Sequence, residues 1–89
     1  MTHDECCEWA EENDTELVFL DDADEAIIGI VVDGLEDCRI AYSKRKFLEI
    51  LQKQGMTESE AEEWYEYNTL RSLPYMGKHS PIFLEESCG

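Results

Sequence analysis

The chain has 89 residues, a formal net charge of −15, 43% hydrophobic residues and four cysteines. This length supports one domain with one modest core, and the apolar content is too high for simple disorder. The longest apolar run, residues 26–32, is far shorter than the roughly 20 residues needed to span a bilayer, and the N-terminus lacks a secretory signal. We therefore expect a single cytoplasmic domain over residues 1–89, with its cysteines as free thiols.

The negative charge is concentrated in the first part of the chain. Residues 1–38 contain 14 Asp or Glu and no Lys or Arg, whereas residues 39–89 contain eight acids and seven bases. Charge gathered in this way indicates a surface that meets something basic. The same charge repels phosphate and anionic lipid, so direct binding to nucleic acid or to a membrane is not expected.

Two elements are expected before the first acidic cluster. Residues 3–13, within an acidic N-terminal extension over residues 1–15, favour a short helix. Its apolar stripe, at positions i, i+3 and i+4, consists of Cys6, Trp9 and Ala10. Residues 16–20 are rich in Leu, Val and Phe and favour a strand, which the acidic residues 21–25 interrupt as a turn.

A β-hairpin is expected next. Residues 26–32 are β-branched and continuous, which is typical of a central strand. Asp33-Gly34 is a strong turn signal, and residues 39–42 favour a returning strand. We expect these two strands to pair in antiparallel fashion.

Two helices follow in the predicted order. Ser43 can cap a helix that runs to Gln54, and Gly55 can end it in the left-handed conformation. Thr57, with Glu three residues on, matches the capping-box pattern for a helix over residues 58–70. The face of this third helix expected to pack on the core consists of Ala61, Trp64, Tyr65 and Asn68.

The chain closes with a loop over residues 73–80 and a strand over residues 81–84, with Pro81 where its missing donor costs least. The order is helix, strand, strand, strand, helix, helix, strand. It predicts an α+β fold in which a small antiparallel sheet of three or four strands packs against a helical hairpin, with a short N-terminal helix.

No catalytic or metal motif has weight comparable to the charge. His3, Cys6 and Cys7 resemble a fragment of a zinc site, but adjacent cysteines depart from the usual spacing and no second pair follows. Packing of a cysteine on the apolar side of the helix is the alternative. Neither His3 nor His79 has a catalytic partner fixed by spacing, and acids beside Cys38 disfavour its thiolate. We expect a protein that is not an enzyme and has no metal or cofactor.

The acidic cluster at the predicted turn consists of Asp21, Asp22, Asp24 and Glu25. Its oxygens suit Ca²⁺ or Mg²⁺, but the calcium-loop pattern fails because Ile27 stands where glycine is required. Two interpretations stay open: a solvated acidic turn, or a contact surface for a basic partner.

A second acidic set on the third helix is spaced at i, i+4 and i+8 and consists of Glu58, Glu62 and Glu66. Like charges at this spacing cost only about 0.2–0.5 kcal/mol per pair, so the stripe can be a solvated face. Alternatively, carboxylates about 6 Å apart along the helix axis can imitate the phosphates of one DNA strand. Tyr67 lies off the buried stripe and is a candidate for an exposed contact.

The basic cluster at the start of the second helix consists of Lys44, Arg45 and Lys46. Internal pairing with the acidic N-terminal segment is one interpretation. A weaker one is a small-anion site formed by Lys44, Arg45 and Arg71, against which the net charge counts.

Several segments carry a family resemblance: Asp-Asp-x-Asp-Glu-Ala-Ile-Ile-Gly near residue 22, Gly-Met-Thr-Glu-x-Glu-Ala-Glu-Glu-Trp-Tyr-Glu-x-Asn over residues 55–68, and Pro81-Ile82-Phe83. Together they resemble a family of small uncharacterised proteins of tailed bacteriophages and prophages. The loop before Pro81 and the acidic N-terminal extension depart from that family's pattern. The resemblance implies phage origin and a compact fold, but no reaction, and it favours an antagonist of a host protein.

Two functions from different classes remain. The first is an inhibitor in the host cytoplasm that imitates nucleic acid at the basic site of a host nuclease, repair enzyme or defence protein. Its predicted partner-binding residues are Asp21, Asp22, Asp24, Glu25, Glu58, Glu62, Glu66 and Tyr67. The second is a phage interaction or assembly protein, dimeric through a sheet edge, whose charge only keeps it in solution. Mimicry is favoured if residues 4–25 and 58–66 share one side of the domain, and solubility if they are opposed.

Overall fold

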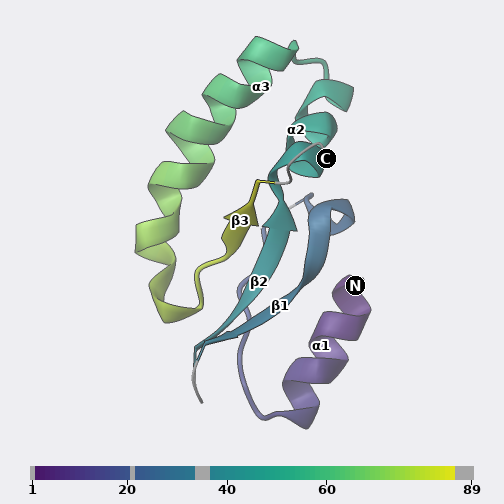
Figure 1. Ribbon diagram of the computed structural model, residues 1–89, viewed down its shortest axis with the longest axis vertical. Coiled ribbons are helices and arrows are strands. Elements are labelled where there is room, and N and C mark those ends of the chain that lie inside the picture. Colours follow the sequence, from purple (N-terminus) through teal and green to yellow (C-terminus); the bar gives the residue numbers. More distant parts are fainter. Residues whose placement is uncertain (1, 21, 34–36, 86–89) are drawn as a thin grey trace.

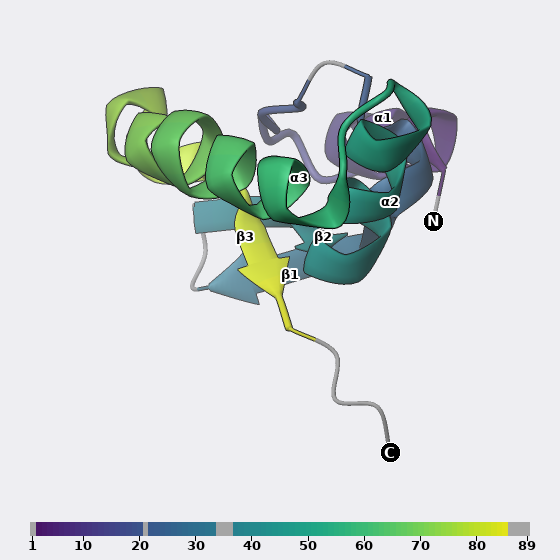
Figure 2. The same cartoon turned by 90° about the horizontal axis from the view of Figure 1, so that it is seen from above.

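Three strands form a sheet, and helices lie on one of its faces (Figures 1 and 2). The computed structural model describes residues 2–20, 22–33 and 37–85. In strand order the sheet consists of β1 (Ile27–Asp33), β2 (Asp37–Ser43) and β3 (Ile82–Leu84). The predicted α+β class is confirmed, with a sheet that is mixed rather than antiparallel throughout.

The predicted β-hairpin is confirmed. β1 and β2 are antiparallel, with Ile30 opposite Ile40 and Val32 opposite Cys38. A bulge interrupts the register between Ile27 and Gly29. The glycine of the predicted turn lies outside the described residues.

The direction of β3 corrects the sequence prediction, because β3 pairs with β2 in parallel, with Phe83 opposite Tyr42. The chain leaves the end of β2 into one helix and comes back along another (Figure 1). It therefore re-enters the sheet from the end at which β2 began. A helical crossover of this kind is what a parallel neighbour requires.

The strand predicted over residues 16–20 is wrong. This segment has no regular secondary structure and crosses the helix-covered side of the sheet (Figure 2). Leu17, Phe19 and Leu20 pack against the core, and the Leu20 N–H donates to the Tyr42 hydroxyl over 2.8 Å. The apolar residues therefore serve packing within the helical layer instead of pairing with a strand.

The N-terminal helix is confirmed as α1 (His3–Glu12). Thr2 and Glu5 form a capping box at its start, which satisfies two otherwise free N–H groups. Cys6 is fully buried, as expected for the apolar side of the helix, while Cys7 is exposed.

The caps predicted for α2 (Lys44–Lys53) are confirmed at both ends. The Ser43 hydroxyl accepts the Lys46 N–H over 3.2 Å. At the other end Gly55 has φ +108°, and its N–H donates to the Gln52 carbonyl while the next N–H, of Met56, donates to that of Leu51. These two bonds form a Schellman motif, which satisfies the last carbonyls of the helix.

The third helix is confirmed in position but is not α-helical throughout. α3 (Glu58–Trp64) starts at the capping box of Thr57 and Glu60, and a π-helix continues it over Tyr65–Leu70. The buried positions are Ala61, Tyr65 and Thr69. Trp64, predicted to be core, is 39% exposed because the buried face follows the four-residue spacing of these three positions.

Two short 3₁₀ segments within Leu73–His79, separated by a kink at Gly77 (φ +83°), occupy the predicted loop. Two contacts attach the end of this stretch to β2. The Arg39 guanidinium donates to the Ser80 carbonyl over 3.2 Å and to its hydroxyl over 2.9 Å, and His79 Nδ1 lies 3.0 Å from the Cys38 carbonyl oxygen. These contacts fix where the chain enters β3.

Four aromatic rings join the layers of the core. The Phe83 ring lies 5.6 Å from that of Tyr42, 5.2 Å from that of Phe47 and 5.0 Å from that of Tyr65, measured between centroids. The cluster therefore connects β3 to β2, α2 and the helix that follows α3. None of the helices in the described part of the chain combines the length and apolar character needed to cross a membrane.

Replacing Gly55 with alanine tests the left-handed end of α2. No atom would obstruct the added Cβ, so the cost comes from φ alone. We expect Gly55→Ala to lower the free energy of unfolding by about 1 kcal/mol in urea denaturation. Gly29→Ala is the matched control, because Gly29 also has open space around it but no positive φ, and we expect it to be neutral or slightly stabilising. Equal losses in the two variants would contradict this account.

Candidate partner-binding surfaces

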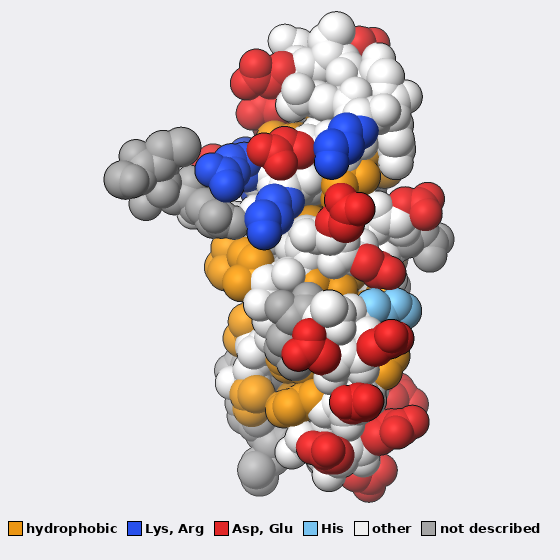
Figure 3. All heavy atoms as spheres, turned by 90° about the vertical axis from the view of Figure 1, so that its right-hand side faces the viewer, with side chains coloured by type: hydrophobic (Ala, Val, Ile, Leu, Met, Phe, Trp, Pro, Cys, Tyr) orange, Lys and Arg blue, Asp and Glu red, His pale blue; other side chains and the backbone are white. Residues whose placement is uncertain are grey.

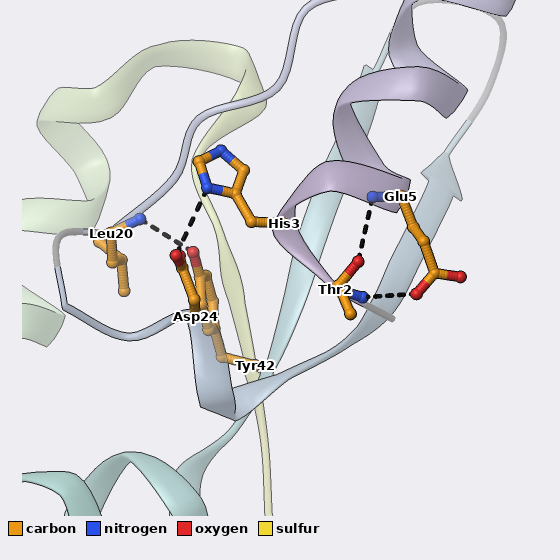
Figure 4. Close-up of polar contacts among 6 residues, drawn as sticks. All are labelled: Thr2, His3, Glu5, Leu20, Asp24 and Tyr42. Atoms are coloured by element: carbon orange, nitrogen blue, oxygen red, sulfur yellow. Dashed lines mark hydrogen bonds and ion pairs between the residues drawn. The ribbon is translucent and has the colours of Figure 1, made fainter.

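The start of α1 lies beside the acidic turn at residues 22–25 (Figure 4). His3 Nδ1 is 3.4 Å from Asp24 Oδ2, and the His3 ring packs on the Phe19 ring with centroids 4.1 Å apart. The contact between His3 and Asp24 holds the first helical turn of α1 against the acidic turn at residues 22–25. It thereby brings together acids that are some 20 positions apart in the sequence.

These two segments form what we name the N-terminal acidic surface: Asp4, Glu5, Asp22, Asp24 and Glu25. All five are exposed and line two adjoining grooves, of about 670 and 410 Å³, which share Asp24 and Glu25. The structure therefore brings three of the predicted partner-binding residues together, while Asp21 lies outside the described residues. Figure 3 shows acidic side chains spread over this side of the molecule.

Little of this charge is neutralised by ion pairs. Among the described residues, the basic and acidic side chains within 4.0 Å of each other are Lys44 and Glu85, at 3.3 Å, and His3 and Asp24, which form an ion pair only when the imidazole is protonated. Lys44 therefore pairs with the C-terminal segment, not with the acidic N-terminal segment as one interpretation held. Lys46 and Lys53 line the grooves, and neither forms an ion pair with an acid among the described residues.

The predicted stripe of Glu58, Glu62 and Glu66 is exposed on α3 and on the π-helix after it. In Figure 1, α1 and α3 lie at opposite long sides of the molecule, and Figure 2 shows both of them on the helix-covered side of the sheet. The grooves lined by Asp22, Asp24 and Glu25 contain none of Glu58, Glu62 and Glu66, so the two acidic sets belong to separate elements. The change to a π-helix at Tyr65 also ends the regular α-helical repeat before the last member of the stripe.

Tyr67 belongs to a different face from that stripe. It lines a groove of about 290 Å³, which we name the α3 groove, formed by Met56, Glu60, Glu63, Trp64, Tyr67 and Asn68. Tyr67 is 55% exposed, as predicted for this residue. Glu60, Glu63 and Trp64 were missed as site residues.

A sequence signal for this groove exists. Positions 60, 63, 64 and 67 are at i, i+3, i+4 and i+7, which is the spacing of one helix face. The prediction assigned Trp64 to the core and counted only glutamates four apart, so this mixed acidic and aromatic face was not recognised.

Capping hydrogen bonds lower the pKa of one carboxyl group in the N-terminal acidic surface and of one in the α3 groove. The Thr57 N–H donates to Glu60 Oε1 over 3.0 Å, and this bond lowers the pKa of Glu60 below its ordinary value. The Thr2 N–H does the same for Glu5, also over 3.0 Å, and lowers the pKa of its carboxyl group. Burial, in contrast, raises the pKa of the Cys6 thiol, so this thiol is held protonated.

The candidate small-anion residues are not assembled into one site. Lys44 pairs with Glu85, while the Arg71 guanidinium carbon lies 4.7 Å from the centroid of the Tyr67 ring. Lys44 Nζ also lies 5.5 Å from the centroid of the Tyr65 ring, six residues before Arg71 in the sequence. Arg45 is exposed on α2. In the described part of the chain, no group of three or more His, Cys, Asp or Glu side chains is arranged to hold a metal ion.

No protein-family model, curated protein or solved structure matches this chain. The resemblance to a phage protein family, based on the segment over residues 55–68, therefore stays a prediction.

Glu60→Gln tests whether the capping bond from the Thr57 N–H needs an ionised Glu60, through the pH dependence of the protein's stability. Because the folded-state pKa of Glu60 is lowered, its carboxylate contributes stability that is present above pH 4.5 and is lost as the pH falls through the lowered folded value. Glutamine keeps a capping side chain without the charge. We expect the variant to be less stable than the wild type at pH 7 and the two to converge on acidification, as measured by thermal unfolding from pH 7 to pH 3. A gap that stays constant over this range would contradict the bond's ionic character.

Proposed function

We propose that this protein is a non-enzymatic inhibitor that occupies the basic, nucleic-acid-binding site of a host nuclease, repair enzyme or defence protein in the host cytoplasm. One observation carries the proposal: acids from α1 and from the turn at 22–25 meet in one surface, and most of them have no ion-pair partner among the described residues. An exposed acid that forms no ion pair within its own molecule can attract a basic partner over a distance.

The two acidic regions lie on separate helices, which by the sequence criterion favours the solubility account, so the mimicry that we propose rests on one region alone. A rod of DNA presents charge continuously along one side, but here α1 and α3 are on opposite long sides of a molecule about 40 Å long (Figure 1). We therefore assign the electrostatic attraction of the proposed complex to the N-terminal acidic surface. The stripe of Glu58, Glu62 and Glu66 is not needed for that contact.

The resemblance of residues 55–68 to proteins of tailed bacteriophages supports a host protein as the partner. Phage proteins act inside the host cell, where basic nucleic-acid-binding proteins are abundant targets. The proposal concerns binding alone, and no step of chemistry is assigned to the chain.

A second candidate is an interaction or assembly protein that forms a homodimer through its sheet. It is favoured by apolar side chains that the strands leave exposed, namely Val32 at 61% and Leu84 at 42%. A second copy that covered them would remove this apolar surface from water. In that case the charge serves solubility. This candidate requires a dimer in analytical ultracentrifugation at micromolar concentration, whereas the inhibitor does not.

Capture from a bacterial lysate at low salt, with mass spectrometry, tests the proposed function. We expect enrichment of basic nucleic-acid-binding proteins, elution by moderate salt and displacement by duplex DNA. With the partner identified, the triple variant Asp22→Asn/Asp24→Asn/Glu25→Gln should slow association by about tenfold or more at low salt, measured by stopped flow or surface plasmon resonance.

The matched control removes three exposed charges from α3 and the π-helix after it: Glu58→Gln/Glu62→Gln/Glu66→Gln. We expect it to change the association rate much less. Equal effects of the two triple variants would show that only net charge matters. Capture that is insensitive to salt, or that yields no basic protein, would rule out the mimicry.

A further inference from the structure

The α3 groove combines exposed aromatic and acidic side chains. Trp64 and Tyr67 present 39% and 55% of their surfaces to solvent, one helical turn apart. Glu60 and Glu63 lie in the same groove, and no lysine or arginine is among the described residues that line it. The aromatic residues supply the rigid, amphipathic area typical of contact hot spots, and the glutamates give the groove a negative potential.

The local packing keeps the groove in shape. The Trp64 ring lies 6.2 Å from the Phe47 ring, centroid to centroid, so its inner side is supported by the core. The Asn68 side-chain amide donates to the Trp64 carbonyl over 3.1 Å. Glu60 is fixed through Oε1 by the capping bond to the Thr57 N–H. The aromatic residue and the carboxylate are therefore positioned before any partner arrives, which lowers the entropic cost of binding.

The molecule already shows that the Tyr67 ring accepts a guanidinium group. The Arg71 guanidinium carbon lies 4.7 Å from the centroid of that ring, within the range of a cation–π contact. A planar guanidinium can stack on an aromatic ring and at the same time donate hydrogen bonds to a carboxylate. The chemistry of the groove matches those two requirements.

We propose that the α3 groove binds an arginine side chain of the partner protein, stacked on Trp64 and Tyr67 and paired with Glu60 and Glu63. This inference rests on the proposed function, which supplies a basic protein as the partner. The arginine contact would add a specific anchor to the long-range attraction of the N-terminal acidic surface. A second copy of this chain is the less suitable occupant, because the net charge of −15 opposes self-association and the rim of the groove is acidic.

Trp64 itself can report on occupancy of the groove. The chain has two tryptophans, Trp9 and Trp64, so Trp9→Phe leaves Trp64 as the single tryptophan. In this background we would titrate an acetylated and amidated peptide of nine arginines, and separately one of nine lysines, at 150 mM salt. We expect both peptides to bind, since both carry the same charge. The arginine peptide should bind about 3-fold more tightly or better and change the Trp64 emission more strongly.

Variants locate the site. Tyr67→Leu should weaken the arginine peptide about 2–5-fold, and Tyr67→Phe, which keeps the ring, should stay within about 2-fold of the parent. Glu60→Gln/Glu63→Gln should weaken it roughly 2–10-fold. The matched control Glu8→Gln/Glu11→Gln removes two exposed charges from α1 and should change the affinity by less than about 2-fold. Far-ultraviolet circular dichroism of each variant checks that the fold is retained.

Three results would overturn the inference: equal affinity for the two peptides, no response of Trp64, or equal losses in the two double glutamate variants. If one of these occurs while lysate capture still depends on salt and on the N-terminal acidic surface, the arginine site is refuted and the proposed function stands. If Trp64 responds selectively to arginine but the lysate yields no basic protein, the proposed function fails and the groove remains an arginine-binding site.

Discussion

The packing of Phe83 against three other rings is the constraint on which the rest of this structure depends. Phe83 lies within 5.0–5.6 Å of the rings of Tyr42, Phe47 and Tyr65, and so holds the short strand β3 to β2 and to both central helices. Tyr42, fully buried, also accepts the Leu20 N–H, which places the segment before the acidic turn. One aromatic cluster thus positions the turn of the N-terminal acidic surface and the helix that carries the α3 groove.

Besides the hairpin and the fold class, the features predicted correctly from the sequence are helix ends that are decided within about four residues. Ser43 caps α2, Thr57 opens α3 and Gly55 ends α2 in a left-handed conformation, and each depends on a hydrogen bond to a near neighbour. The strand predicted at 16–20 failed because apolar content alone does not distinguish pairing from packing in a helical layer. The direction of β3 failed because it depends on where a helical pair returns the chain, a property of tertiary structure.

The same distinction explains what was predicted of the binding surfaces. Exposure of Asp22, Asp24 and Glu25 followed from a local turn signal, but their meeting with the start of α1 depends on the distant contact between His3 and Asp24. The α3 groove was missed because Trp64 was assigned to the core. In the structure the buried face follows Tyr65 and Thr69 into a π-helix, and this leaves the indole at the edge of the core, where it can contact both Phe47 and solvent.

The position of the acids along α1 bears on why they are there. Asp4 and Glu5 occupy the first turn, where the helix dipole favours negative charge, so they stabilise the fold wherever the protein acts. Glu11 and Glu12 stand at the other end, in a last turn without any base, where the dipole opposes them. Charge placed against the dipole and without an ion pair among the described residues lowers stability. The needs of folding therefore do not explain the charge of Glu11 and Glu12. The remaining physical cause is an interaction of these side chains with the surroundings, either solvent or a basic partner.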